Sequence, residues 1–133
     1  MKNKNSGYSL LQLIVVLSII AVIAGYFSFR FSGILDEIKL QSAVKMIQSD
    51  LMAIKTKAQT EHNDQEIIFL TSQYSFNGRK KTLPSSVLII NPQTIKFGSS
   101  GMPVPGYFGT LKLNCHNKTA SIVISPQGRI RIE

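Results

Sequence analysis

An uncharged apolar run near the start of the chain limits what this sequence can fold into. The run, SGYSLLQLIVVLSIIAVIAGYFSF (Ser6–Phe29), is preceded by Lys2 and Lys4 and followed by Arg30. A helix rises about 1.5 Å per residue, so about 20 apolar residues span the roughly 30 Å hydrocarbon core of a membrane. A secretory signal peptide has a shorter apolar core of about 7–15 residues. The sequence therefore predicts one membrane-spanning helix, and the positive-inside rule places everything after Arg30 outside the cytoplasm.

The segment after this run has the periodicity of an amphipathic helix. Its apolar residues recur at steps of three and four and form one stripe, made of Leu40, Val44, Ile47, Leu51, Ile54 and Ala58. No proline interrupts the chain before Leu83, so the spanning segment and this stem are predicted to form one helix from about Ser9 to about Thr60. With 133 residues in all, the chain has room for one small soluble domain beside the helix.

From Glu66 onward, apolar and polar residues alternate and turn residues become frequent. Asn77-Gly78 is a strong signal for a two-residue hairpin turn, whereas Gly98–Gly109, with its prolines and glycines, is predicted to be a loop. The expected short strands are EIIFL, SQYSF, KKTL, VLII, TIKF, TLKLNC, ASIVIS and RIRIE. The predicted fold class is therefore α+β, with a long N-terminal helix, half membrane-spanning and half amphipathic, packed on a small antiparallel β-sheet.

Positive charge is concentrated in the second half of the chain. The net charge is +8, and residues 67–133 contain eight basic residues but only one acidic residue, Glu133. Residues 30–66 contain five basic and six acidic residues. A field of one sign favours an anionic partner such as nucleic acid or a phospholipid surface, although a merely solvated basic face has the same composition.

The sequence shows no pattern typical of an enzyme. It has no Ser-His-Asp set, no phosphate-binding glycine loop and no paired-carboxylate site. Cys115 and His116 are adjacent and His62 is isolated, so no Cys/His cluster has the spacing of metal ligands. As the single cysteine, Cys115 excludes an internal disulfide, and it is predicted to be a buried apolar residue rather than a reactive one. We therefore expect no catalytic activity, no cofactor and no metal site.

The leader and the apolar run resemble the type IV pilins and their pseudopilin relatives. The likeness is carried by KNSGYSLLQLIVVLSIIAVIAG (Lys4–Gly25), in which a short basic leader ends in Gly7, Tyr8 is aromatic, Gln12 is polar and the apolar run follows. In that family a membrane prepilin peptidase cuts after the glycine and methylates the new N-terminus. The resemblance implies cleavage between Gly7 and Tyr8 in a bacterial inner-membrane protein. It also implies a periplasmic soluble domain and later assembly with major and minor pilins in a pilus or pseudopilus.

The same resemblance divides the chain into four parts and draws attention to Gln12. These parts are a leader peptide (1–7), a membrane-spanning and polymerisation helix (8–31), an amphipathic stem (32–60) and an antiparallel β domain with a basic tail (61–133). The family usually has a glutamate where this chain has Gln12, and that carboxylate pairs with the N-terminus of a neighbouring subunit. Gln12 cannot form this ion pair, which suits a minor or terminal subunit. Alternatively, Gln12 is simply a tolerated polar residue near the membrane surface.

The C-terminal region, Thr94–Glu133, resembles GspH/FimT-type minor pilins and is most like the FimT side. It contains a strand closing in Phe-x-x-x-Gly, a Pro/Gly loop, a strand ending near a cysteine, and a final Gly-Arg-x-Arg. In FimT-like proteins this tail is associated with DNA binding, and some members belong to pili used for DNA uptake in natural transformation. The resemblance therefore implies sequence-independent DNA binding by Arg129 and Arg131.

Strand geometry supports this hypothesis. Alternation in an extended chain places Arg129 and Arg131 on one face, about 6.6 Å apart, and the flanking isoleucines, Ile130 and Ile132, on the other. Each guanidinium can contact a phosphate, and Gly128 leaves room for close backbone approach. Further candidate contacts are Lys80, Lys81, Lys96, Lys112 and Lys118.

Two alternatives remain open at this point. In the first, the two arginines form surface salt bridges on an edge strand, where charges also deter aggregation. In the second, the chain is a GspH-like structural pseudopilin of a type II secretion system, or a subunit that primes pilus assembly, and binds no DNA.

Overall fold

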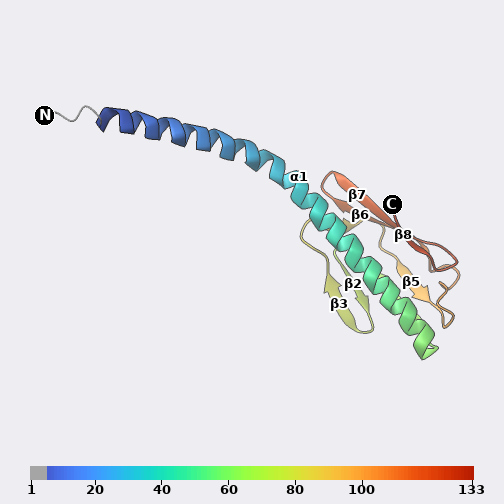
Figure 1. Ribbon diagram of the computed structural model, residues 1–133. Coiled ribbons are helices and arrows are strands. Elements are labelled where there is room, and N and C mark those ends of the chain that lie inside the picture. Colours follow the sequence, from blue (N-terminus) through green and yellow to red (C-terminus); the bar gives the residue numbers. More distant parts are fainter. Residues whose placement is uncertain (1–5) are drawn as a thin grey trace. The chain divides into compact units, whose positions relative to one another are not determined.

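The computed structural model describes the backbone of residues 6–133 and the side chains of residues 9–27 and 33–133. In this range the chain forms one helix, α1 (Ser6–Glu61), and eight strands, which confirms the expected elements close to their expected bounds (Figure 1). The chain divides into two compact units, Met1–Leu35 and Asp36–Glu133. The strands are β1 (Gln65–Phe69), β2 (Gln73–Phe76), β3 (Arg79–Thr82), β4 (Val87–Ile89), β5 (Thr94–Phe97), β6 (Gly109–Cys115), β7 (Lys118–Ile124) and β8 (Ile130–Ile132).

The first unit contains an exposed apolar helical segment. Ser9–Phe27 has 19 residues with a mean hydropathy of 2.6, and none of them is buried. By length and composition this segment can cross a membrane. Its Ser18 hydroxyl donates a hydrogen bond of 2.7 Å to the Ile14 carbonyl, so that polar group is satisfied within the helix itself.

The β part of the second unit consists of two antiparallel sheets instead of the single sheet expected. The strand orders are β3-β2-β1-β5 and β4-β6-β7-β8. The loop Gly98–Gly109 covers the outer edge of β5, where the Val104 N–H donates to the Lys96 carbonyl at 2.8 Å. Pro103, which has no N–H, lies opposite Phe97 at that edge. Because the loop and its proline occupy this edge, the first sheet ends at β5 in the described chain.

A tight turn joins β2 to β3, as the Asn-Gly pair predicted. Phe76 pairs with Arg79 across the hairpin. Between them Asn77 has φ 49° and Gly78 has φ 73°. Positive φ at both central residues is the requirement of a type I′ turn, so the predicted hairpin is confirmed.

Helix α1 packs its apolar stripe into a core shared with both sheets. All six predicted stripe residues are at most 5% exposed, which confirms the predicted buried face. The first sheet adds side chains such as Ile67 and Phe97, and the second adds Leu111 and Ile122. Cys115 is also fully buried, as predicted, and burial raises the pKa of its thiol. This burial supplies the hydrophobic stabilisation of the domain.

One polar cluster links α1 to the first sheet. The Tyr74 hydroxyl donates a hydrogen bond to the Asp50 carboxylate, although the tyrosine ring belongs to the core. Lys81 Nζ lies 2.8 Å from each oxygen of the same carboxylate. Burial, and then the hydrogen bond to Asp50, raise the pKa of Tyr74 above its ordinary value. The buried hydroxyl therefore has the partner that burial requires.

Candidate nucleic-acid interface

The two tail arginines lie on an edge strand of the second sheet. Among the described strands, β8 pairs with β7 alone, through Ile122 with Ile132, Val123 with Arg131 and Ile124 with Ile130. A short turn leads into the strand, and in it the Arg129 N–H donates to the Ser125 hydroxyl at 3.1 Å. Arg129 and Arg131 are both exposed.

The isoleucines of β8 differ from the expected pattern. Ile130 packs against the core, as the alternation predicted. Ile132 is 44% exposed, because it lies next to an open groove that Leu40 and Val44 also line. One isoleucine, and not two, therefore docks β8 onto the core.

A groove between α1 and the β8 region contains both arginines. Its volume is about 570 Å³, and its walls are Met52, Lys55, Thr56 and Gln59 of α1 and residues 128–131. Three of these lining residues are cations and none is acidic. Among the described residues, no carboxylate lies within ion-pair distance of Arg129 or Arg131, so the predicted alternative of surface salt bridges is not observed. The groove presents unpaired positive charge on a concave surface.

Lys55 is a groove residue that the sequence analysis missed. Its Nζ donates a hydrogen bond of 2.8 Å to the carbonyl of Gly128, which fixes the ammonium beside the arginines. The available signal was weak: Lys55 directly follows the buried Ile54, so it lies at the margin of the buried helix face. Nothing in the local pattern indicates that this margin lies beside the C-terminal strand.

Gly128 has a different role from the one expected. The residue is buried, its φ is +76°, and a Cβ built on it would lie 2.9 Å from the Gly101 carbonyl oxygen. From the sequence, DNA is expected to approach the backbone closely at this glycine. In the structure, Gly101 and the Lys55 ammonium occupy that space instead. Only glycine combines this backbone conformation with this packing. Gly128 thus fixes the start of the arginine strand.

Three of the other predicted cations are paired with acids. Lys81 bonds Asp50, Lys96 lies 3.2 Å from Asp64, and Lys118 lies 2.5 Å from Glu37. The Lys118 ammonium, hydrogen-bonded to Glu37, holds the pKa of that carboxyl below its ordinary value.

The predicted lysines are also dispersed over the fold. Lys80 and Lys81 lie on β3 and Lys96 on β5 of the first sheet, whereas Lys112 and Lys118 lie on β6 and β7 of the second. Lys80 and Lys112 are exposed. None of these five lysines lines the groove that contains the arginines.

The remaining predicted residues belong to the first unit. Gln12 is exposed on α1, within the apolar segment Ser9–Phe27. Gly7 and Tyr8 lie outside the residues whose side chains are described. The cleavage site between them and the assembly role of Gln12 therefore stay predictions.

Comparison with known proteins supports the fold. Neither a protein-family model nor a curated protein sequence matches the chain. Two crystal structures of the type IV minor pilin FimU from Pseudomonas aeruginosa do match, in different crystal forms. One has a TM-score of 0.61 and 20% identity and covers 73% of this chain and 90% of the chain in that crystal structure. The other has a TM-score of 0.59 and 21% identity and covers 71% and 92%. The chain therefore has a pilin-like α+β fold.

Proposed function

We propose that this protein is a minor subunit of a type IV pilus that binds DNA without sequence preference and takes part in DNA uptake. The observation that carries the DNA-binding part is the groove in which Arg129, Arg131 and Lys55 come together without an acidic lining residue. The likeness to FimU and the exposed apolar segment of α1 support the pilus part.

Each cation of the groove has a defined task in this proposal. Arg129 and Arg131 each bind a backbone phosphate with a planar guanidinium fork. Lys55 adds a third charge, and its hydrogen bond to Gly128 keeps the turn before Arg129 in place. Contacts to phosphates carry no sequence information, so the protein accepts DNA of any sequence, as uptake of arbitrary DNA requires.

The N-terminal region would place the groove outside the cell membrane. A prepilin peptidase would cut between Gly7 and Tyr8, and Ser9–Phe27 would hold the subunit in the inner membrane with its β domain in the periplasm. Once extracted, the same apolar surface would pack against other major and minor pilins. Gln12, which lacks the usual charge, would suit a minor position in that filament.

Paired double variants test the DNA-binding role on the full chain in a nonionic detergent. Arg129→Gln with Arg131→Gln removes two groove charges, and Arg79→Gln with Lys80→Gln removes two exposed charges from β3. DNA affinity is measured for unrelated duplexes over a series of salt concentrations. Each lost phosphate contact lowers the slope of log affinity against log salt by about 0.9, so the groove variant should lose about 1.8.

The control pair decides between a site and a general charge effect. We expect Arg79→Gln with Lys80→Gln to change the slope much less, and we expect both proteins to keep the parental melting temperature. Transformation frequency in the host should fall only for the groove variant. Equal losses from both pairs would refute the groove, and unchanged affinity in both would favour the structural pseudopilin without DNA binding.

A further inference from the structure

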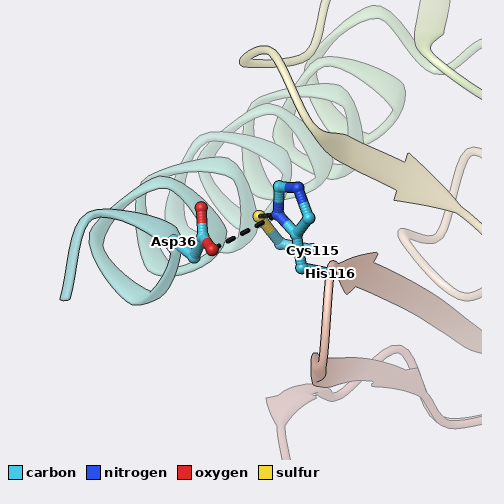
Figure 2. A group of neighbouring side chains, drawn as sticks. All are labelled: Asp36, Cys115 and His116. Atoms are coloured by element: carbon cyan, nitrogen blue, oxygen red, sulfur yellow. Dashed lines mark hydrogen bonds and ion pairs between the residues drawn. The ribbon is translucent and has the colours of Figure 1, made fainter. Parts of the chain in front are cut away.

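Three different metal-binding side chains converge at one end of the second unit. Asp36 comes from α1, Cys115 ends β6, and His116 begins the turn to β7 (Figure 2). One ligand atom from each, a carboxylate oxygen, Sγ and Nδ1, all lie within 4.8 Å of one another. Sequence spacing did not indicate this cluster, because its third member lies far away in the sequence on the helix.

Two distances between these atoms are close to the edges of a tetrahedral metal centre. Zinc binds carboxylate oxygen and histidine nitrogen at about 2.0–2.1 Å and thiolate sulfur at about 2.3 Å, so the edges of a tetrahedron are about 3.3 Å for O to N and about 3.6 Å for N to S. In this protein His116 Nδ1 lies 3.3 Å from Asp36 Oδ2 and 3.8 Å from Cys115 Sγ. The third pair, the carboxylate oxygen and Sγ, lies within 4.8 Å, so the three atoms are close enough to share one zinc ion.

The backbone holds two of the ligands in place. Cys115 pairs with Val87 on one side and Lys118 on the other, and it is fully buried. His116 has a φ of 53°, a left-handed conformation that is uncommon for a residue other than glycine. In this conformation its ring faces the Asp36 carboxylate, as Figure 2 shows. The histidine side chain is 62% exposed, so an ion can reach the cluster from solvent.

We propose that Asp36, Cys115 and His116 bind a zinc ion, with water in the fourth position. The three donors are the carboxylate, thiolate and imidazole groups that zinc prefers. The thiol proton passes to solvent as the Zn–S bond forms, and the two anionic ligands then neutralise the charge of the ion. The bound ion cross-links α1 to the β6–β7 hairpin and stabilises the domain. This inference does not depend on the proposed DNA binding.

Zinc titration of the full chain, purified in a nonionic detergent without a histidine tag, tests this proposal. We expect one zinc ion per chain by calorimetry and a higher melting temperature when zinc is present in excess. Cobalt(II) serves as a spectroscopic probe, and it should give visible d–d bands together with a thiolate-to-metal charge-transfer band. Cys115→Ala should abolish the charge-transfer band.

Two ligand variants and a matched control complete the experiment. Asp36→Asn and His116→Asn remove one ligand each, and asparagine suits the left-handed conformation of His116. Each should weaken zinc binding at least about tenfold. Loss of a residue that only hydrogen-bonds a metal ligand already has an effect of this size, and these variants remove a ligand itself. His62→Asn is the control, since His62 also has a positive φ, of 49°, but lies outside the cluster.

The outcomes separate a site from incidental binding. Without metal, Asp36→Asn and His116→Asn should melt close to the metal-free parent, which shows that they are folded. Zinc affinity that is the same in Asp36→Asn, His116→Asn and the parent would overturn the proposal. So would an equal loss in His62→Asn, or a cobalt complex of the parent without the charge-transfer band.

Discussion

The edge strands β3 and β8 both carry clustered positive charge, but they present it differently. β3 has Arg79, Lys80 and Lys81, and the last of these is bound to the Asp50 carboxylate. β8 and its preceding turn have Arg129 and Arg131, which share a groove with a third cation. In the proposed function, the number of cations on a strand does not by itself make an anion site. The proposal depends instead on cations that have no acidic partner and that come together on a concave surface.

Helix α1 and two glycines produce this difference. Asp50 lies where α1 meets the first sheet, whereas Lys55 lies where it meets the turn before β8. Gly78, at the tip of the β2–β3 hairpin, has open space around it. Gly128 is in contact with Gly101 and the Lys55 ammonium. β3 therefore begins from a hairpin turn with open space around its glycine, and β8 begins from a fixed turn.

The largest expected effect comes from adding one methyl group to each glycine. Gly128→Ala must strain a φ of +76° and also push a Cβ to within 2.9 Å of the Gly101 carbonyl oxygen, a backbone atom that cannot move alone. We expect the free energy of unfolding to fall by about 3 kcal/mol. Gly78→Ala strains a similar φ but meets no atom within 4 Å, so it should cost only about 1 kcal/mol. Urea denaturation in detergent measures both, and equal costs would contradict the difference between the two turns.

Local patterns predicted the elements of this fold well. The stripe from Leu40 to Ala58 and the Asn77-Gly78 turn depend on spacing along a single segment, which the sequence displays directly. The division into two sheets depends on which strand pairs with which, and that choice is set by contacts between distant segments. Because the described strands are short, the pattern alone does not rank the possible pairings.

The candidate site was predictable only in part, for the same reason. Exposure of Arg129 and Arg131 follows from alternation along the last strand. The acids that pair with Lys81 and Lys118 lie on α1, and the orientation of the helix over the sheets decides which lysines they reach. The same orientation brings Lys55 to the arginines. Sequence distance gave no hint of these contacts.

The next largest effect should come from removing the acid that binds the β3 cation. Asp50→Ala leaves the buried Tyr74 hydroxyl and the Lys81 ammonium without their partner. A buried donor without a partner costs about 1–3 kcal/mol, so we expect stability to fall by about 2 kcal/mol. Asp64→Ala is the control, because the Asp64 side chain is 49% exposed, against 13% for Asp50, and its ion pair with Lys96 should contribute less than about 1 kcal/mol. Similar losses in urea denaturation would show that the Asp50 cluster is an ordinary surface pair.

Lys55 tests the other side of the comparison. Lys55→Met removes the charge and the donor to the Gly128 carbonyl but keeps the length of the side chain. We expect a loss of about 1.5 kcal/mol of stability and a decrease of about 0.9 in the salt slope of DNA binding.

The neighbouring Lys57 offers a matched control for this change. It forms an exposed pair with Glu61 one turn further along the same helix, and it does not line the groove. Lys57→Met should cost less than about 0.5 kcal/mol and leave the salt slope nearly unchanged. Equal changes in slope for the two variants would mean that net charge, and not the groove, attracts the DNA.

The smallest effect concerns the response of the β3 side to alkaline pH. Tyr74 loses its proton near pH 10 in the unfolded chain but keeps it to higher pH in the folded protein, because burial and Asp50 raise its pKa. Above about pH 10 the unfolded state therefore binds fewer protons, and the free energy of unfolding falls as pH rises. Between about pH 9 and pH 10.5 this group should account for a loss of about 0.8 kcal/mol.

Tyr74→Phe should remove that part of the pH dependence, whereas Tyr107→Phe, at a side chain that is 43% exposed, should retain it. Parallel pH profiles for the parent and Tyr74→Phe would show that the Tyr74–Asp50–Lys81 cluster opens to water. In that case the cluster would not explain why Lys81 differs from a free cation.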